Sequence, residues 1–365
     1  FNFCSSLTSI TIPDSVTSIE KQAFGYCSSL TSISIPDSVT SIGNEVFAGC
    51  SFTKFKLGKN VKTIGEAIFS SCKLLNSIEF NDVLEAIPDS AFSYCSKLSE
   101  VTLPDSIKEI GSHAFYECSA LTEVNLNEGI TLIGDQAFWT CEALTSIKIP
   151  DSVETIGSGI LMFCKCLTKA TIGNGITTLS YSTFYSCSSL KSIEIPSNIK
   201  SIGETAFYNC SKLKDVTIPA SVKNIGSDVF IYCSSLESVT IYNPDCSIAA
   251  RSSTLGEKGN VTIKSYKDSL AQDYAEEFGY QFEVLEGEPP KVTTTTTTKA
   301  TTTTKATTTK PTTTTAPVTT KEFGDINGDN KIDARDASLI LAFYAFSSTE
   351  GGKDTTLRTF VENQK

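Results

Sequence analysis

The chain has 365 residues, of which 40% are hydrophobic, and a formal net charge of −11. Lysine and arginine are scattered rather than clustered, which argues against nucleic acid or an anionic membrane as a partner. No run of about 18 apolar residues occurs, so we expect no membrane span. The first ten residues lack the basic start and apolar core of a signal peptide. We expect a fragment of a secreted protein whose leader lies upstream.

A repeat of 23 residues organises the sequence up to about residue 241. Every interval between successive cysteines of the repeat is 23 residues, except one of 22, and the positions are Cys4, Cys27, Cys50, Cys72, Cys95, Cys118, Cys141, Cys164, Cys187, Cys210 and Cys233. A phenylalanine stands three residues before each cysteine, with the single exception of Leu161. This regularity predicts a repeat solenoid of about 11 coils over residues 1–241, mainly β-structure with short turns or helices.

Apolar residues within one unit alternate as in a β-strand and then reappear after a turn at residues 13–15. The inward positions of the first unit are Leu7, Ile10, Ile12, Val16, Ile19, Ala23, Phe24 and Cys27. Burying about seven such side chains contributes roughly 10–20 kcal/mol. Ordering one coil costs about 35 kcal/mol. A single coil therefore cannot fold alone, and we expect stability to come from stacking.

The unit resembles the BspA-type leucine-rich repeat of bacterial surface and secreted proteins. Residues 27–47 (CSSLTSISIPDSVTSIGNEVF) and 187–207 (CSSLKSIEIPSNIKSIGETAF) carry the resemblance, which extends over residues 1–285. It implies a leucine-rich repeat solenoid that serves as an adhesion or protein-binding module, since a fold by itself does not define a ligand.

The repeat pattern ends at Tyr242, and Cys246 lies out of register. Residues 261–263 are predicted to form a last repeat strand, residues 267–278 a helix and residues 280–285 a final strand. Because an open solenoid end exposes its core, we expect residues 242–290 to be a C-terminal cap.

Equivalent cysteines on adjacent coils should lie about one strand spacing apart, ~4.8 Å. Stacked side chains point in parallel, so we favour a buried column of free thiols that act as small hydrophobic groups. Scattered disulfides are the alternative, with Cys164 and Cys166 the most unusual pair. A metal site is less favoured because there is no C-x-x-C pair and His113 is the only histidine.

Two columns of side chains could face solvent. The outward strand positions are small or mixed in charge and contain no aromatic residue. The position after each phenylalanine is apolar on successive coils and forms a candidate ligand-binding stripe: Tyr116, Trp139, Met162, Tyr185 and Tyr208, with Ile231 after them. These rings either bind a protein or glycan or fold down against the next coil.

Residues 291–321 hold 19 threonines, five lysines, two prolines and no acidic residue. Such a composition cannot build a core, so we predict a disordered threonine-rich linker. Its hydroxyl groups are candidate sites of O-glycosylation.

Residues 322–365 contain an EF-hand-like loop, which predicts calcium as a cofactor because calcium takes six to eight oxygen ligands. The predicted ligands are Asp325, Asn327, Asp329, Lys331 through its carbonyl, Asp333 and Asp336. A predicted helix at residues 337–346 follows directly.

This small α-helical segment resembles half of a type I dockerin, a module that binds cohesin modules on scaffoldin proteins and so assembles cellulosomes. The resemblance covers residues 323–347, and only one of the two loops of that family is present. Residues that match its cohesin-binding positions are Ala334, Arg335, Leu341, Ala342 and Phe346.

No nucleophile elbow, P-loop, dinucleotide-binding or zinc-protease motif occurs, so we expect no enzyme. The sequence therefore predicts a secreted, cellulosome-associated protein: its tail binds a cohesin, and its repeats bind a protein or glycan. The alternatives are a host- or surface-adhesion protein and a structural spacer, neither of which binds cohesin.

Overall fold

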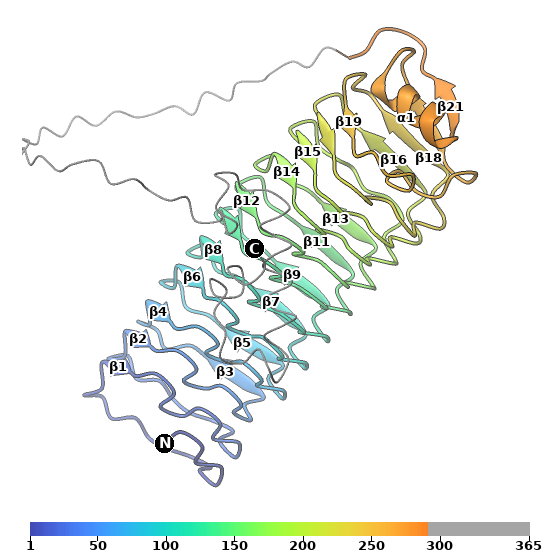
Figure 1. Cartoon of the computed structure of the whole chain (residues 1–365). Coiled ribbons are helices and arrows are strands. Elements are labelled where there is room, and N and C mark those ends of the chain that lie inside the picture. The colour runs from blue at the N-terminus through green and yellow to red at the C-terminus, as the bar shows by residue number, and fades with distance from the viewer. Residues whose placement is uncertain (291–365) are drawn as a thin grey trace, which may run out of the picture. The chain divides into compact units, whose positions relative to one another are not determined.

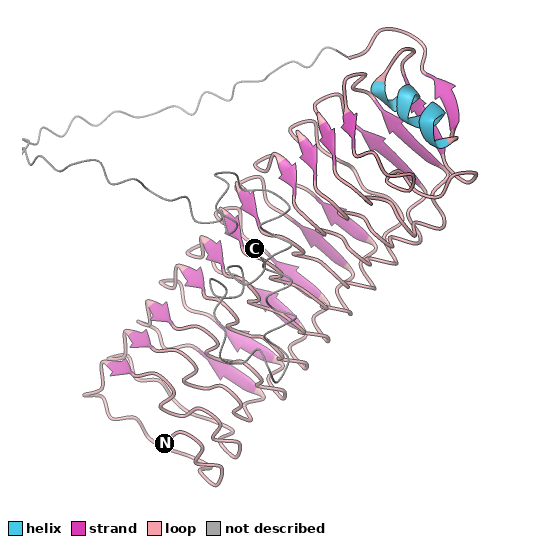
Figure 2. Cartoon of the chain, in the orientation of Figure 1, coloured by secondary structure: helices cyan, strands magenta, loops and turns pink. Residues whose placement is uncertain are grey.

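A computed structural model of the chain describes residues 1–290, which fall in one compact unit. They form a β-solenoid of about 12 turns, in which each coil lies on the one before it (Figure 1). The predicted solenoid is thus confirmed, with about one turn more than the cysteine count indicates. Most coils have a strand on two of their sides and tight turns on the third (Figure 2).

The first side carries the longer strands, which pair in parallel from coil to coil. They are β3 (Lys54–Lys56), β5 (Ser77–Glu79), β7 (Glu100–Thr102), β9 (Glu123–Asn125), β11 (Ser146–Lys148), β13 (Lys169–Thr171), β16 (Asp215–Ile218), β18 (Ser238–Ile241), β20 (Thr262–Ser265) and β21 (Gln281–Val284). In most of the three-residue strands the middle residue is buried and the flanking residues are exposed, as with Val101 of β7. This alternation is the one predicted from the repeat.

Two-residue strands form the second side and also pair in parallel. They are β1 (Ser18–Ile19), β2 (Ser41–Ile42), β4 (Thr63–Ile64), β6 (Ala86–Ile87), β8 (Glu109–Ile110), β10 (Leu132–Ile133), β12 (Thr155–Ile156), β14 (Thr178–Leu179), β15 (Ser201–Ile202), β17 (Asn224–Ile225) and β19 (Ser247–Ile248). The register is strict, because Ile110 pairs with Ile133, which in turn pairs with Ile156.

The third side consists of successive tight turns, not a helix, and these turns are also hydrogen-bonded between coils. The Phe92 amide donates to the carbonyl of Ala114 at 2.8 Å, and the Phe115 amide donates to that of Ala137 at 2.8 Å. Two residues on this side of most coils adopt the left-handed conformation, for example Glu117 with φ 55°. Every second amide on this side bonds to the next coil, since the amides of Ser90 and Tyr94 donate to the carbonyls of Ser112 and Tyr116. We call this the turn side.

Phenylalanine rings stack along the inside of the turn side. The centroids of Phe92 and Phe115 lie 5.3 Å apart with an interplanar angle of 6°, and Phe115 and Phe138 follow at 5.4 Å and 3°. All three rings are fully buried. Leu161 interrupts the stack, which resumes at Phe184.

A column of ten buried thiols runs beside these rings, and we call it the thiol column: Cys27, Cys50, Cys72, Cys95, Cys118, Cys141, Cys164, Cys187, Cys210 and Cys233. All are free, in agreement with the favoured interpretation. The Cys118 Sγ donates to the carbonyl oxygen of Phe92, one coil back, at 3.1 Å. That oxygen also accepts from the Cys95 amide at 3.1 Å. Cysteine at this position therefore supplies a small apolar group with one weak donor.

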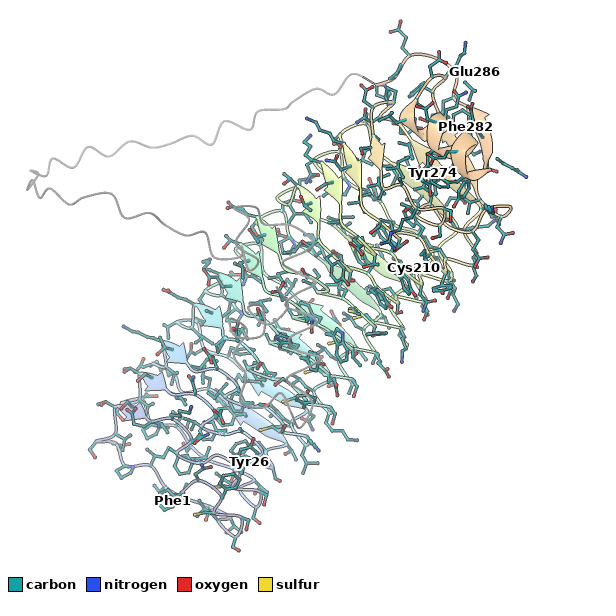
Figure 3. The ribbon with its side chains drawn as sticks, viewed as in Figure 1. Phe1, Tyr26, Cys210, Tyr274, Phe282 and Glu286 are labelled. Carbon is teal, nitrogen blue, oxygen red and sulfur yellow. The ribbon has the colours of Figure 1, made fainter. Side chains whose placement is uncertain are left out.

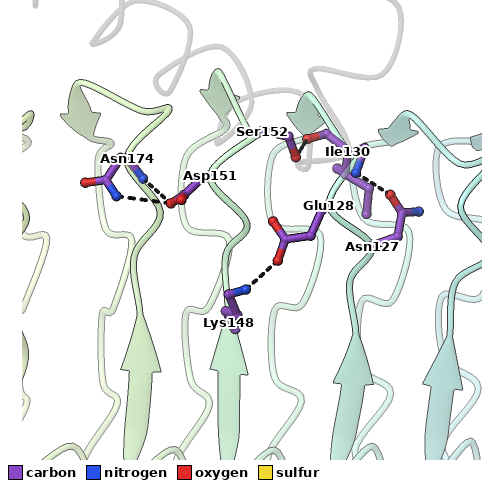
Figure 4. A network of polar contacts seen from close by, with 8 residues as sticks. Asn127, Glu128, Ile130, Lys148, Asp151, Ser152 and Asn174 are labelled. Carbon is purple, nitrogen blue, oxygen red and sulfur yellow. Dashed lines mark hydrogen bonds and ion pairs between the residues drawn. The ribbon is translucent and has the colours of Figure 1, made fainter. Parts of the chain in front are cut away.

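Glycine recurs at the corner after the second strand because the backbones of adjacent coils approach closely there. A Cβ atom on Gly134 would lie 2.5 Å from the Ser112 amide nitrogen, and one on Gly157 would lie 2.4 Å from that of Asp135. Polar side chains join coils at the turn after the first strand (Figure 4). The Asp151 carboxylate accepts from the amide nitrogen of Asn174 at 2.8 Å.

The C-terminal cap covers the last coil, and its labelled residues Tyr274 and Phe282 lie at the end of the stack away from Phe1 (Figure 3). Helix α1 (Leu270–Phe278) begins three residues later than predicted, because the Ser269 side chain caps it by accepting from the amide of Gln272. The last two strands, β20 and β21, are likewise shifted by about one residue from the predicted ranges. Two tyrosine hydroxyls join the helix region to the loop before β20; that of Tyr280 donates to the carbonyl of Gly256 at 2.6 Å.

Replacing Phe138 by alanine should destabilise the solenoid by about 3–5 kcal/mol, because it removes a fully buried ring and leaves a cavity. Phe138→Leu should cost clearly less, since the chain already holds Leu161 at the equivalent position of the next coil. Urea unfolding followed by circular dichroism measures both values. Equal losses for the two variants would contradict the stacking role of this position.

Thiol reactivity should divide the cysteines into two groups. Burial raises the pKa of Cys50 and Cys233 to about 12, so these thiols stay protonated and unreactive at pH 8. Exposed Cys4 and Cys166 should react quickly with a disulfide reagent, and the rest only in denaturant. Because these folded-state pKa values lie above the ordinary value of 9.0, stability should be retained below pH 9 and fall as the pH rises toward 12. Fast native reaction of more than these two thiols would contradict the buried column.

Candidate functional site

The predicted ligand-binding stripe lies on the outer surface of the turn side, one residue after the buried phenylalanine stack. Its members Tyr116, Trp139, Met162, Tyr185 and Tyr208 are all partly exposed, while the preceding Phe or Leu of each coil is buried. The position after the buried residue therefore holds the ring at the surface. The structure places all five predicted residues along one line of successive coils.

Four of the five form two stacked pairs. The ring centroids of Tyr116 and Trp139 lie 4.3 Å apart with an interplanar angle of 5°. Tyr185 and Tyr208 lie 4.4 Å apart at 6°. Such contacts stabilise neighbouring rings beyond the area that they bury. Met162 stands between the two pairs and brings no ring.

Three further aromatic residues, missed in the sequence, extend and connect these pairs. Phe163 bridges them, with centroids 5.5 Å from both Trp139 and Tyr185. Tyr94 adjoins Tyr116 at 5.4 Å, and Tyr232 adjoins Tyr208 at 5.2 Å. We call the resulting seven rings the aromatic column: Tyr94, Tyr116, Trp139, Phe163, Tyr185, Tyr208 and Tyr232.

A signal for the three missed residues is present in the sequence. Tyr94, Phe163 and Tyr232 each stand directly before a repeat cysteine, and they are 69 residues apart in both intervals. Tyr26 occupies the same position nearer the N-terminus, where its ring stacks on that of Phe3 at 4.9 Å. When equivalent residues of successive repeats are compared one position at a time, it is not visible that residues from two neighbouring positions form one column.

The two interpretations of the predicted stripe prove to be compatible. The rings do lie against those of the adjoining coils, which orders them without a ligand. They also stay partly exposed, and Tyr94 and Tyr232 at the two ends of the aromatic column are 43% and 55% exposed. An ordered, accessible row of rings loses little conformational entropy on binding.

The aromatic column is neutral at physiological pH. Partial burial, together with the neighbouring phenol groups of Tyr185 and Tyr232, raises the pKa of Tyr208 to about 12. Burial likewise raises the pKa of Tyr116. These phenols therefore act as hydrogen-bonding groups and not as charges. His113 approaches the Tyr116 ring at 5.4 Å and is the only histidine of the chain.

The face of the longer strands is polar by comparison. Exposed ion pairs join adjacent coils there, as between Lys56 and Glu79 at 2.5 Å and between Lys148 and Glu128 (Figure 4). Pairs of this kind contribute little to stability. A shallow depression of about 800 Å³ lies near its C-terminal end, lined in part by Lys191, Lys212 and Lys214. Lys214 is itself paired with Glu237 at 3.2 Å.

Within residues 1–290, no cluster of three or more histidine, cysteine or acidic side chains is arranged to hold a metal ion. The same part of the chain contains no helix that is long and apolar enough to cross a membrane. The calcium loop at residues 325–336, the cohesin-binding positions between Ala334 and Phe346, and the linker at residues 291–321 lie outside the described residues.

Fold and surface together define a leucine-rich repeat solenoid with an aromatic column on its turn side. The profile of the BspA type leucine rich repeat region matches residues 1–122, 85–214 and 159–252, which together cover more than half of the chain. The chain belongs to the BspA-type leucine-rich repeat family.

Two solved structures resemble the described solenoid. A leucine-rich repeat protein from Bacteroides ovatus shares 29% sequence identity with a TM-score of 0.64, over 78% of this chain and 80% of that chain. The pneumococcal vaccine antigen PcpA has the same fold at 20% identity and a TM-score of 0.54, over 77% of this chain and 80% of that chain. No curated protein matches the chain.

Proposed function

We propose that this protein is a non-catalytic, secreted binding protein whose aromatic column holds a protein or glycan ligand. The observation that carries the proposal is the unbroken contact of seven partly exposed rings over seven successive coils. Aromatic residues combine a large apolar area with polar edges, and they dominate the energetics of recognition surfaces.

A surface location agrees with this role. The solenoid is shared with PcpA, which is described as a vaccine antigen. The tail at residues 322–365 supplies the second half of the proposal: its calcium loop would order a helix that binds a cohesin module of a scaffoldin, and so attach the solenoid to a cellulosome. The threonine-rich residues 291–321 would separate the two modules as a spacer.

Replacing both Trp139 and Tyr185 by serine should reduce ligand binding at least tenfold and leave the solenoid folded. Serine already occupies the equivalent positions 70 and 93, so the backbone accepts it. The full chain and the variant are compared on a glycan array and on intact bacterial cells, with folding checked by circular dichroism. Tyr26→Ser, an exposed tyrosine outside the aromatic column, is the control. Undiminished binding by the double variant would favour a spacer or another contact surface.

Cohesin binding by the full chain should require calcium and the loop acids. Surface plasmon resonance on type I cohesins should give binding in calcium that a chelator abolishes. Asp325→Ala combined with Asp329→Ala should remove it, because two of the side-chain ligands are lost. Asp135→Ala, an acid in the solenoid, should have no effect. Cell binding with no cohesin affinity would identify a surface adhesin instead.

A further inference from the structure

Three rings of the aromatic column lie at steep interplanar angles to the four stacked rings. The stacked pairs Tyr116–Trp139 and Tyr185–Tyr208 join successive coils face to face, so their planes lie across the solenoid axis. Phe163 meets Trp139 at an interplanar angle of 85° and Tyr185 at 67°. Tyr94 meets Tyr116 at 65°, and Tyr232 meets Tyr208 at 85°.

This geometry decides which ring faces are open to a ligand. A stacked ring such as Trp139 has one face covered by Tyr116, and its other face receives the edge of Phe163. All contacts between Tyr94, Phe163 or Tyr232 and the stacked rings are of the edge type, so no ring of the column lies flat against any of these three. Tyr94 and Tyr232 are also more exposed than the stacked rings, at 43% and 55%. We call Tyr94, Phe163 and Tyr232 the crosswise rings.

The crosswise rings are evenly spaced and similarly oriented by the backbone. Each precedes a repeat cysteine and has a left-handed φ, which is 62° at Tyr94, 62° at Phe163 and 59° at Tyr232. Their separation of 69 residues equals three coils. At ~4.8 Å for each coil, successive crosswise rings lie about 14 Å apart.

Hydrogen-bonding side chains occupy the same backbone position on the coils between them. The residues are Glu117 and Thr140 between the first two crosswise rings, and Ser186 and Asn209 between the second two. Their φ values, 55–57°, match those of the crosswise rings. The Asn209 amide donates to the Ser186 hydroxyl at 3.1 Å, which holds one of these pairs in place. From Tyr94 to Tyr232, this backbone position therefore holds an aromatic ring on every third coil and a polar residue on each of the two coils between.

We propose that the crosswise rings are three stacking platforms for a single extended, neutral glycan chain that runs along the solenoid axis. A pyranose ring offers an apolar C–H face to an aromatic ring and hydroxyl groups around its rim, and the residues between the platforms can bond to such hydroxyls. Evenly spaced platforms suit a polymer of regular repeat better than the irregular side chains of a protein. The rings carry no charge, and only one of the four residues between them does. This inference rests on the proposed function, because it names the ligand class of the aromatic column.

The test measures binding of the full chain to neutral β-1,4-linked oligosaccharides of glucose, xylose and mannose with two to eight sugar residues. Calorimetry gives affinity, and the emission of Trp139, the only tryptophan, reports occupancy between Tyr94 and Phe163. Affinity should rise with chain length until the sugar spans all three platforms. Replacing all three crosswise rings by asparagine should lower affinity at least tenfold, whereas Tyr181→Asn, at an exposed tyrosine that does not precede a repeat cysteine, should leave it unchanged.

Asparagine is chosen because Asn209 already holds this backbone position with φ 56°. If the triple variant does not fold, Tyr232→Asn alone decides the question, since it removes a ring that is 55% exposed. An affinity that does not change with the length of the sugar, or an equal affinity of the folded triple variant, would contradict the proposed stacking platforms. Absence of glycan binding would overturn the ligand class. If a protein ligand is then lost on replacement of Trp139 and Tyr185, the proposed function stands without the glycan.

Discussion

The coil-to-coil step of about 4.8 Å is the constraint on which the rest of this structure depends. Each of the three sides hydrogen-bonds to the next coil at this same spacing. A residue that increased the spacing on one side would therefore break the hydrogen bonds on the other two sides. The pairing of Ile110 with Ile133 on the second side and of Phe92 with Ala114 on the turn side shows two sides that obey it together. The corner glycines and the left-handed residues are the local means by which the backbone keeps to this step.

The same step explains the interior. Phenylalanine rings at 5.3–5.4 Å are the natural filling of a stack with this rise, because parallel rings in offset contact need a similar separation. The thiol column follows for a related reason. A small side chain is required beside the rings, and the Cys118 thiol can reach the Phe92 carbonyl one coil back. The ten cysteines of the thiol column are therefore core residues, and all of them are free thiols.

In a solenoid, the positions at which the residue type varies between repeats are the ones that can carry a specific function. Strands and core repeat almost without change, whereas the two positions after each buried phenylalanine vary from glycine to tryptophan. Stacking turns variation along the sequence into a pattern along the surface. Residues such as Tyr94 and Phe163, three coils apart, thereby become members of one column. The predicted calcium loop differs in this respect, because its predicted ligands all lie within one short segment of the sequence, residues 325–336.

Period and alternation in the sequence by themselves determined the solenoid, the inward residues and the approximate cap, because the apolar positions recur every 23 residues. They favoured a column of free thiols over disulfides, and the structure shows these thiols free. The start of α1 was misjudged by three residues, since the Ser269 cap is a local contact that periodicity does not report. Five residues of the stripe were predicted from one repeat position. Only the tertiary structure showed that Met162 leaves a gap, that Phe163 from the neighbouring position fills it, and that Tyr94 and Tyr232 extend the row. Ring orientation depends on the side-chain contacts between coils, and a periodic pattern of residue types contains no information about the angle between two planes.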